Sequence, residues 1–195
     1  MKKVWVFRHG PKESGAGKNV IAPEMALKNP DGIELTRRVV DTFLKGQQFR
    51  AIFVSPLVRA YQTGVIFAQL LGMDFPKIES GLVGPNLPKW AAVISRLKSY
   101  TCADFYHLEP SFVQEEGERL FETIQLIAKS LEDGDQGLCA SHGGLIEPAM
   151  AAAMTRLGCD FKAILRSIKD LSEGDGFIFQ FDENNNFVGL EEKRL

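Results

Sequence analysis

The chain has 195 residues, of which 45% are hydrophobic and 25% charged, the composition of an ordinary globular protein. This length suffices for one sizeable hydrophobic core but not for a second full domain, so we expect residues 1–195 to form a single domain. The formal net charge of −2 provides no basic excess, so we expect neither nucleic acid nor a membrane surface as a partner. An anion site would have to be a local cluster of Arg, His and backbone N–H groups.

The cysteines and the N-terminus indicate the cellular compartment. Cys102, Cys139 and Cys159 are an odd number without a C-x-x-C pair, which argues against a disulfide framework or a zinc site. The basic first residues precede only four apolar ones, too few for a signal peptide, and no apolar run could span a bilayer. We therefore expect a cytoplasmic protein.

The first predicted strand, residues 4–7, is a run of apolar, strand-favouring residues, as expected of a strand buried on both faces. It ends at the tripeptide Arg8-His9-Gly10. Ligands of open α/β sheets bind in the crevice outside the carboxyl ends of the strands. A cation, an imidazole and a glycine that permits close approach to the backbone therefore stand where a ligand would bind.

A long irregular segment, residues 11–34, follows this strand, and loops of such length are usually functional or disordered. Its Gly17-Lys18 pair does not complete a P-loop, because Lys12 occupies the first glycine position and Asn19 replaces the required Ser or Thr. We interpret Lys12 and Lys18 as solvated lysines, with contact to an anionic ligand as the alternative.

Helix and strand then alternate. A helix is predicted over residues 36–46 with Thr36 as its N-cap, and residues 51–54 form a second buried strand. Ser55 is the predicted N-cap of the next helix, with Pro56 at the first helical position.

Arg59 falls in the first turn of that helix, where the helix dipole disfavours a cation by up to about 1 kcal/mol. An anion held between the guanidinium group and the unpaired N–H groups of the turn explains this position. A nearby carboxylate paired with Arg59 is the alternative.

Residues 72–117 are predicted to be an elaboration over the strand ends and the main source of substrate specificity. Its predicted elements are a short strand, a helix and an irregular stretch, over residues 75–79, 89–98 and 101–110. Ser111 begins a Ser-x-x-Gln capping box with Gln114, which predicts the start of a long amphipathic helix.

A further buried strand, residues 137–141, ends at the sequence Ser-His-Gly-Gly, residues 141–144, and a helix is predicted over residues 145–157. Residues 177–181 and 187–190 are interpreted as a strand pair at the sheet edge. The alternation of strands and helices predicts an α/β fold, a three-layer α/β/α sandwich around a mostly parallel sheet with an antiparallel edge strand.

Three predicted strands thus end in polar sequences that can share one crevice. Two arginines, two histidines and two helix N-termini suit a tetrahedral dianion, because guanidinium binds phosphate oxygens in a bidentate manner and imidazole can donate from one nitrogen and attack with the other. Three segments of the chain, in their order, resemble the motifs of the histidine phosphatase superfamily, also called phosphoglycerate mutase-like. They are Arg8-His9-Gly10, Ser-Pro-Leu-x-Arg-Ala at 55–60 and Ser-His-Gly-Gly at 141–144.

The resemblance implies that His9 is the nucleophile of a phosphomonoesterase and forms a phosphohistidine that water then hydrolyses. Arg8, Arg59 and His142 would bind the phosphoryl group, without a metal or other cofactor. A nucleophilic imidazole must be neutral, so we expect burial and the two guanidinium groups to lower the pKa of His9. The substrate would be a small-molecule or protein phosphomonoester.

A general acid should protonate the leaving alcohol. In the phosphoglycerate mutase-like branch this is a Glu after the third strand, and the nearest match here is Glu79. The alternatives are Glu13, Asp31, His107 and Glu109.

Four other functions compete with this interpretation. A phosphoglycerate mutase-like phosphotransferase is disfavoured by Pro11-Lys12, which replaces the Glu-Thr or Glu-Ser common after Arg-His-Gly. A non-catalytic member of the same fold would only bind phosphorylated ligands. A serine hydrolase using Ser141 leaves the N-terminal Arg-His-Gly unexplained. A two-histidine phosphodiesterase would need hydroxyl residues where Pro11 and Gly144 stand.

Overall fold

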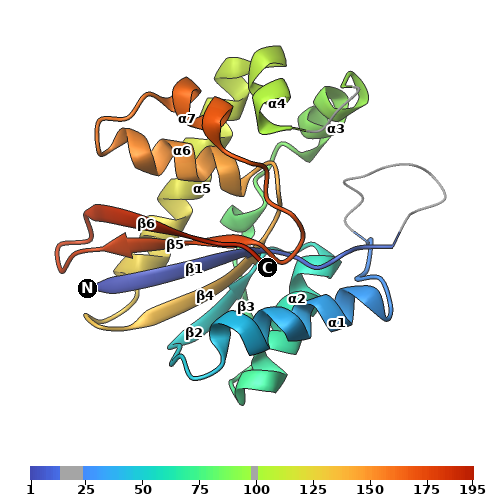
Figure 1. The fold of residues 1–195 in the computed structure, drawn as a ribbon, viewed down its shortest axis with the longest axis vertical. Coiled ribbons are helices and arrows are strands. Elements are labelled where there is room, and N and C mark those ends of the chain that lie inside the picture. Colours follow the sequence, from blue (N-terminus) through green and yellow to red (C-terminus); the bar gives the residue numbers. More distant parts are fainter. Residues whose placement is uncertain (14–23, 98–100) are drawn as a thin grey trace.

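The structure, a computed structural model, describes residues 1–13, 24–97 and 101–195. Its strands are β1 (Lys2–Arg8), β2 (Ala51–Val54), β3 (Lys77–Ile78), β4 (Gln136–Ser141), β5 (Gly176–Phe181) and β6 (Phe187–Lys193). In the described residues they form one six-stranded sheet in the order β3-β2-β4-β1-β5-β6 (Figure 1). Strands β1 to β4 are parallel, whereas β5 is antiparallel to β1 and β6 to β5. The predicted mostly parallel sheet with an antiparallel edge is confirmed.

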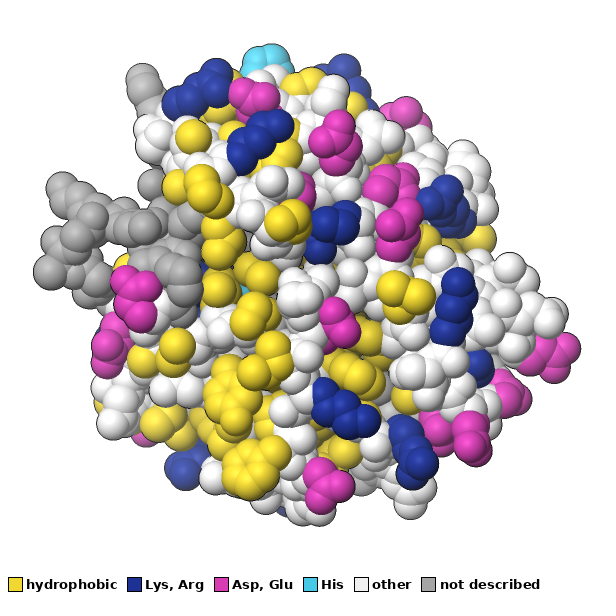
Figure 2. Space-filling view, turned by 180° about the vertical axis from the view of Figure 1, so that it is seen from behind, with side chains coloured by type: hydrophobic (Ala, Val, Ile, Leu, Met, Phe, Trp, Pro, Cys, Tyr) yellow, Lys and Arg dark blue, Asp and Glu magenta, His cyan; other side chains and the backbone are white. Residues whose placement is uncertain are grey.

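Helices cover both faces of the sheet. They are α1 (Asp31–Val39), α2 (Val58–Leu71), α3 (Leu87–Ser95), α4 (Cys102–Leu108), α5 (Pro110–Lys129), α6 (Ile146–Thr155) and α7 (Phe161–Ser167). Helices α1 and α2 lie on one side, and α5 to α7 on the other (Figure 1). No helix in the described ranges is both long and apolar enough to cross a membrane. Acidic and basic side chains are interspersed on the face that Figure 2 shows.

The buried hydrophobic residues form two cores, one on each face of the sheet. The side chains of β1 alternate between them. Val4 and Val6 belong to the core under α5 and α6, whereas Trp5 and Phe7 belong to the core under α1 and α2. Each of these four side chains is at most 4% exposed. The ring of Phe7 meets that of Phe67 of α2 edge to face, with 6.3 Å between the centroids. The prediction of a strand buried on both faces, in a three-layer sandwich, is therefore confirmed.

Two predicted helix starts are wrong. The first helix begins at Asp31, five residues before Thr36, whose hydroxyl donates to the Gly32 carbonyl inside the helix at 2.7 Å. The N-cap of α2 is Leu57 and not Ser55. A cap preference is a local effect of about 1 kcal/mol, so tertiary partners of a hydroxyl can override it.

Three further differences concern the helices that follow β3 and β4. The stretch predicted to be irregular holds α4, for which Thr101 accepts a hydrogen bond from Asp104 N–H at 3.1 Å. The predicted capping box of Ser111 and Gln114 does not form, because α5 begins at Pro110 and both residues lie inside the helix. The sequence analysis does not predict α7, which Asp160 caps.

The segment after β1 is described only in part. Lys12 forms an isolated antiparallel bridge with Leu27, and α1 starts within the stretch that was predicted to be irregular. Gly17, Lys18 and Asn19 lie outside the described residues.

Candidate active site

The carboxyl ends of β1, β2 and β4 lie side by side, because these strands are parallel neighbours. The N–H of His9 donates to the carbonyl of Ser141 at 3.0 Å, and that of Ser55 to Ala140 at 3.1 Å. A cavity of about 270 Å³ opens at this edge. Its lining includes the four residues predicted to bind phosphate, Arg8, His9, Arg59 and His142. The structure thus brings these four side chains together.

His9 is 5% exposed and is held in one orientation by two hydrogen bonds. Its Nδ1 lies 2.6 Å from the Gly10 carbonyl oxygen, and Arg59 Nε donates to its Nε2 at 3.0 Å. A carbonyl only accepts and Arg Nε only donates, so Nδ1 carries the proton and Nε2 presents its lone pair. Burial, and secondly the charge of Arg59, holds the pKa of His9 well below its usual value. This shift has the direction expected for a neutral imidazole.

His142 lies beside His9, with 5.1 Å between the ring centroids. Its Nε2 is 2.7 Å from Ser55 Oγ, and that oxygen also accepts from Leu57 N–H at 3.3 Å. Its Nδ1 is buried and has no hydrogen-bond partner among the described residues. Burial, then the neighbouring His9, lowers the pKa of His142. A ligand in the cavity can therefore take the hydrogen bond of Nδ1.

Ser55, predicted from the sequence to be a helix cap, instead contacts His142 at the candidate site. Its hydroxyl accepts from Leu57, so its own proton can go to Nε2 of His142. That arrangement leaves the ring proton on Nδ1. The sequence signal was available, because Ser55 directly follows β2 at the same sheet edge as the two histidines.

Three cations surround the imidazoles. Arg8 pairs with Glu173 at 3.0 Å and also donates to the Leu171 carbonyl. Burial, then repulsion from Arg59, lowers the pKa of Lys12 to about 8. Burial, then repulsion from Arg8, lowers the pKa of Arg59 to about 10. Crowded cations of this kind are stabilised by a bound anion.

Glu147 links two parts of the site, and the sequence analysis did not single it out. It is 1% exposed, and its oxygens accept from Gly144 N–H at 2.8 Å and Leu171 N–H at 3.0 Å. The carbonyl of Leu171 in turn accepts from Arg8. Glu147 thus ties the loop after His142 to the segment that holds Arg8. The available signal was an acidic residue in an otherwise apolar helix, α6.

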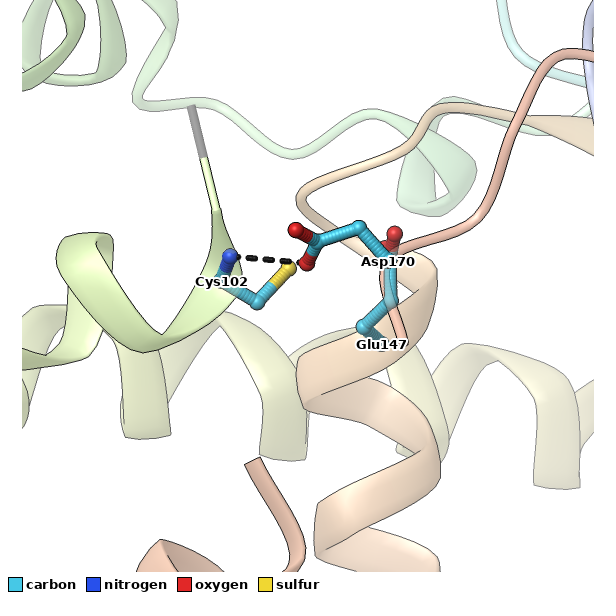
Figure 3. A group of neighbouring side chains, drawn as sticks. All are labelled: Cys102, Glu147 and Asp170. Carbon is cyan, nitrogen blue, oxygen red and sulfur yellow. Dashed lines mark hydrogen bonds between the residues drawn. The ribbon is translucent and has the colours of Figure 1, made fainter. Parts of the chain in front are cut away.

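Cys102, Glu147 and Asp170 converge from the start of α4, from α6 and from the segment after α7 (Figure 3). Their potential ligand atoms lie within 4.8 Å of one another, so by type they could hold a metal ion. However, burial raises the pKa of both the Cys102 thiol and the Glu147 carboxyl. Asp170 already accepts from Cys102 N–H at 2.9 Å. Cys102 and Glu147 therefore favour their protonated forms, and the three residues connect three segments of the chain.

The structure does not bring Glu79 to the cavity lining. Its carboxylate accepts from Gly81 N–H at 3.0 Å and so caps the short 3-10 turn Ser80–Leu82. The other candidate acids are likewise absent from the described lining, namely Glu13, Asp31, His107 and Glu109. Among the described residues, the carboxyl groups in the lining are those of Glu147 and Asp170.

The sequence matches the profile of the histidine phosphatase superfamily (branch 1) over residues 4–167. The chain belongs to this superfamily. The matched region contains the four clustered residues, Arg8, His9, Arg59 and His142. No curated protein sequence matches the chain significantly.

Solved structures, among them two of phosphatases, share the fold. YhfR of Bacillus stearothermophilus is 16% identical with a TM-score of 0.68, and the alignment covers 96% of this chain and 95% of that one. Phosphoserine phosphatase of Entamoeba histolytica, solved with 3-phosphoglyceric acid, is 17% identical at a TM-score of 0.64, covering 100% and 98%. A mycobacterial glucosyl-3-phosphoglycerate phosphatase, solved with VO3, is 15% identical at 0.62, covering 92% and 93%. At these identities the likeness concerns the fold alone.

Proposed function

We propose that this protein is a metal-independent phosphomonoesterase that acts through a phosphohistidine at His9. The observation that carries the proposal is the orientation of the ring, with Nδ1–H on the Gly10 carbonyl and Nε2 beside Arg59 in the cavity. Phosphorus is attacked by a neutral imidazole nitrogen with a directed lone pair. The phosphatase neighbours support the same reaction class.

The reaction would run in two transfers. Nε2 of His9 attacks phosphorus, the bond to the leaving oxygen breaks, and the alcohol takes up a proton. Water then gives a proton back to the group that protonated the alcohol and attacks the phosphohistidine, the phosphorus–nitrogen bond breaks, and inorganic phosphate leaves with Nε2 of His9 neutral again. Arg8, Arg59 and Nδ1–H of His142 would stabilise the charge on the phosphoryl oxygens in both steps.

For the proton of the leaving alcohol we propose Asp170. Both carboxyl groups line the cavity, but Glu147 accepts from two backbone N–H groups, one on each oxygen, whereas Asp170 accepts from Cys102 N–H through one oxygen only. Loss of a general acid slows esters of poorly acidic alcohols far more than esters of nitrophenol, which leaves without a proton. Asp170→Asn should therefore impair an alkyl phosphate at least tenfold more than p-nitrophenyl phosphate. The same comparison with Glu79→Gln tests the acid predicted from sequence.

The central test is hydrolysis of p-nitrophenyl phosphate by the wild type and by His9→Ala. We expect turnover that vanadate inhibits and a chelator does not change, with turnover abolished in His9→Ala and severely reduced in His142→Ala. His9→Ala should stay folded, since it removes a polar group at a strand end and little core volume. Wild-type turnover by His9→Ala would refute the mechanism.

Product analysis distinguishes the phosphatase from the mutase-like and non-catalytic alternatives. Phosphate release into water indicates a phosphatase, whereas transfer to an added phosphoalcohol would indicate a mutase-like phosphotransferase. Phosphate binding without turnover or a phosphorylated His9, as seen by mass spectrometry, would indicate a non-catalytic binding protein.

A further inference from the structure

The cavity continues from the phosphate-binding residues onto an apolar wall. Helix α3 contributes Leu87, Trp90 and Ile94, which are spaced three and four residues apart and so share one helical face. The rest of this wall comes from Val83, Phe105 and Leu145. The rings of Trp90 and Phe105 meet edge to face with 5.5 Å between their centroids. In Figure 1, α3 stands over the side of the sheet where β1 ends.

Leu87 and Ile94 form the rim of this wall and are more exposed than Trp90 and Phe105 at its base. Trp90 and Phe105 are 4% and 5% exposed, whereas Leu87 and Ile94 are only partly buried. An apolar group lying against Leu87 and Ile94 would remove their remaining apolar surface from water, which is favourable.

A polar leaving group would meet the opposite situation. The six wall side chains contain one polar atom, Nε1 of Trp90, which is buried and unpartnered among the described residues. Hydroxyl groups of a sugar or polyol placed against this wall would lose hydrogen bonds to water and find at most this one N–H in exchange, which is unfavourable.

We propose that the substrate is a phosphomonoester whose leaving alcohol has an apolar body, aliphatic or aromatic, rather than a sugar or polyol phosphate. The inference rests on the proposed function, because the phosphoryl group must sit at His9 for its leaving group to reach α3. The two can be tested separately, since binding of a phosphonate needs no turnover.

The test measures binding of ethyl-, butyl- and hexylphosphonate by calorimetry, with 3,4-dihydroxybutylphosphonate as the polar match to butyl. We expect Kd to fall about three- to fourfold per methylene, the ratio that burial of one methylene produces, with a negative heat-capacity change. The dihydroxy compound should bind more weakly than butylphosphonate. Affinity independent of chain length, tighter binding of the dihydroxy compound, or no binding of any phosphonate would overturn the inference.

Variants locate the effect on α3. Leu87→Asn and Ile94→Asn should each weaken hexylphosphonate about tenfold and ethylphosphonate less than twofold, because only the longer chain reaches them. Leu126→Asn is the matched control, since Leu126 is 63% exposed on α5 and outside the described lining. Both rim residues are partly exposed, so these variants should fold, which circular dichroism checks. An equal loss for both ligands, or the same loss in Leu126→Asn, would contradict the assignment. If His9→Ala kept full turnover while phosphonate affinity still rose with chain length, the phosphohistidine mechanism would be refuted but the apolar leaving-group site would not.

Discussion

Arg59 Nε donates to His9 Nε2 at 3.0 Å, across 50 positions of the sequence. The bond keeps the proton off Nε2 and holds the ring toward the cavity. The same bond keeps the guanidinium group of Arg59 within reach of a phosphoryl oxygen bound at His9. We infer that phosphate binding exchanges the nitrogen for an oxygen as the acceptor of Arg59, which releases the lone pair at the moment a phosphorus atom is in reach.

This relationship makes Arg59→Lys a severe change. Lysine keeps the charge but loses the planar group that can reach both His9 and a phosphate, so we expect kcat/KM to fall about 100-fold or more. Steady-state kinetics with p-nitrophenyl phosphate measure the loss. Arg166→Lys, an exposed arginine on α7, is the control and should behave as wild type. An unimpaired Arg59→Lys would show that the bond to His9 has no role.

Ser55→Ala should distinguish a positioning residue from a helix cap. Loss of the hydroxyl leaves Nε2 of the buried His142 without its 2.7 Å partner, so the proton need not stay on Nδ1. We expect kcat to fall about tenfold and the pH profile to shift, with a stability loss of about 1–3 kcal/mol. A stability loss with unchanged kcat and pH profile would indicate a purely structural hydroxyl.

Lys12 should make anion binding depend on pH. Its pKa of about 8 means that the side chain is charged at pH 7 and mostly neutral at pH 9. Raising the pH across this range should weaken sulfate binding about tenfold, the loss of one charge-assisted hydrogen bond, while sulfate itself keeps its charge. In Lys12→Arg the affinity should stay constant over the same range. A pH-independent wild type, measured by calorimetry, would contradict this expectation.

Glu147→Ala should weaken both stability and phosphate binding. The substitution leaves the partly buried N–H of Gly144 and the buried N–H of Leu171 without their acceptor, which we expect to cost about 2–4 kcal/mol in the free energy of unfolding. Without Glu147, the loop that follows His142 and the Leu171 carbonyl that binds Arg8 both lose an anchor, so KM should rise as well. Urea denaturation and kinetics measure the two effects, with the exposed Glu115→Ala as control. A stable variant with unchanged KM would refute the proposed link.

The two buried histidines, His9 and His142, should make the protein sensitive to acid. Their pKa values are lowered in the folded protein, mainly by burial, so below pH 6.5 the unfolded chain binds protons that the folded chain does not. The free energy of unfolding should therefore fall as pH drops below about 6.5, by roughly 1.4 kcal/mol per pH unit for each histidine. Denaturation from pH 7 to 5 should show a shallower slope for the double variant His9→Gln/His142→Gln. The exposed His107→Gln should keep the wild-type slope.

Local reasoning from the sequence failed where a side chain had two possible partners. Thr36 and Ser55 are common N-cap residues, yet the hydroxyl of Thr36 bonds within α1 and that of Ser55 bonds to His142. The general acid predicted at Glu79 stays a prediction that Glu79→Gln tests, and in the structure its carboxylate accepts from Gly81 N–H. Each outcome depends on which donor or acceptor the folded chain brings closest, and sequence spacing does not contain that information.

The amino-acid sequence by itself determined the sheet and its functional edge. Apolar runs identify β1, β2 and β4, and parallel neighbours end together, so His9, Arg59 and His142 had to meet. Only the tertiary structure decided the tautomer of His9, the role of Glu147 and the apolar wall on α3. These depend on hydrogen bonds and burial between segments far apart in the chain, which arise when the three layers pack.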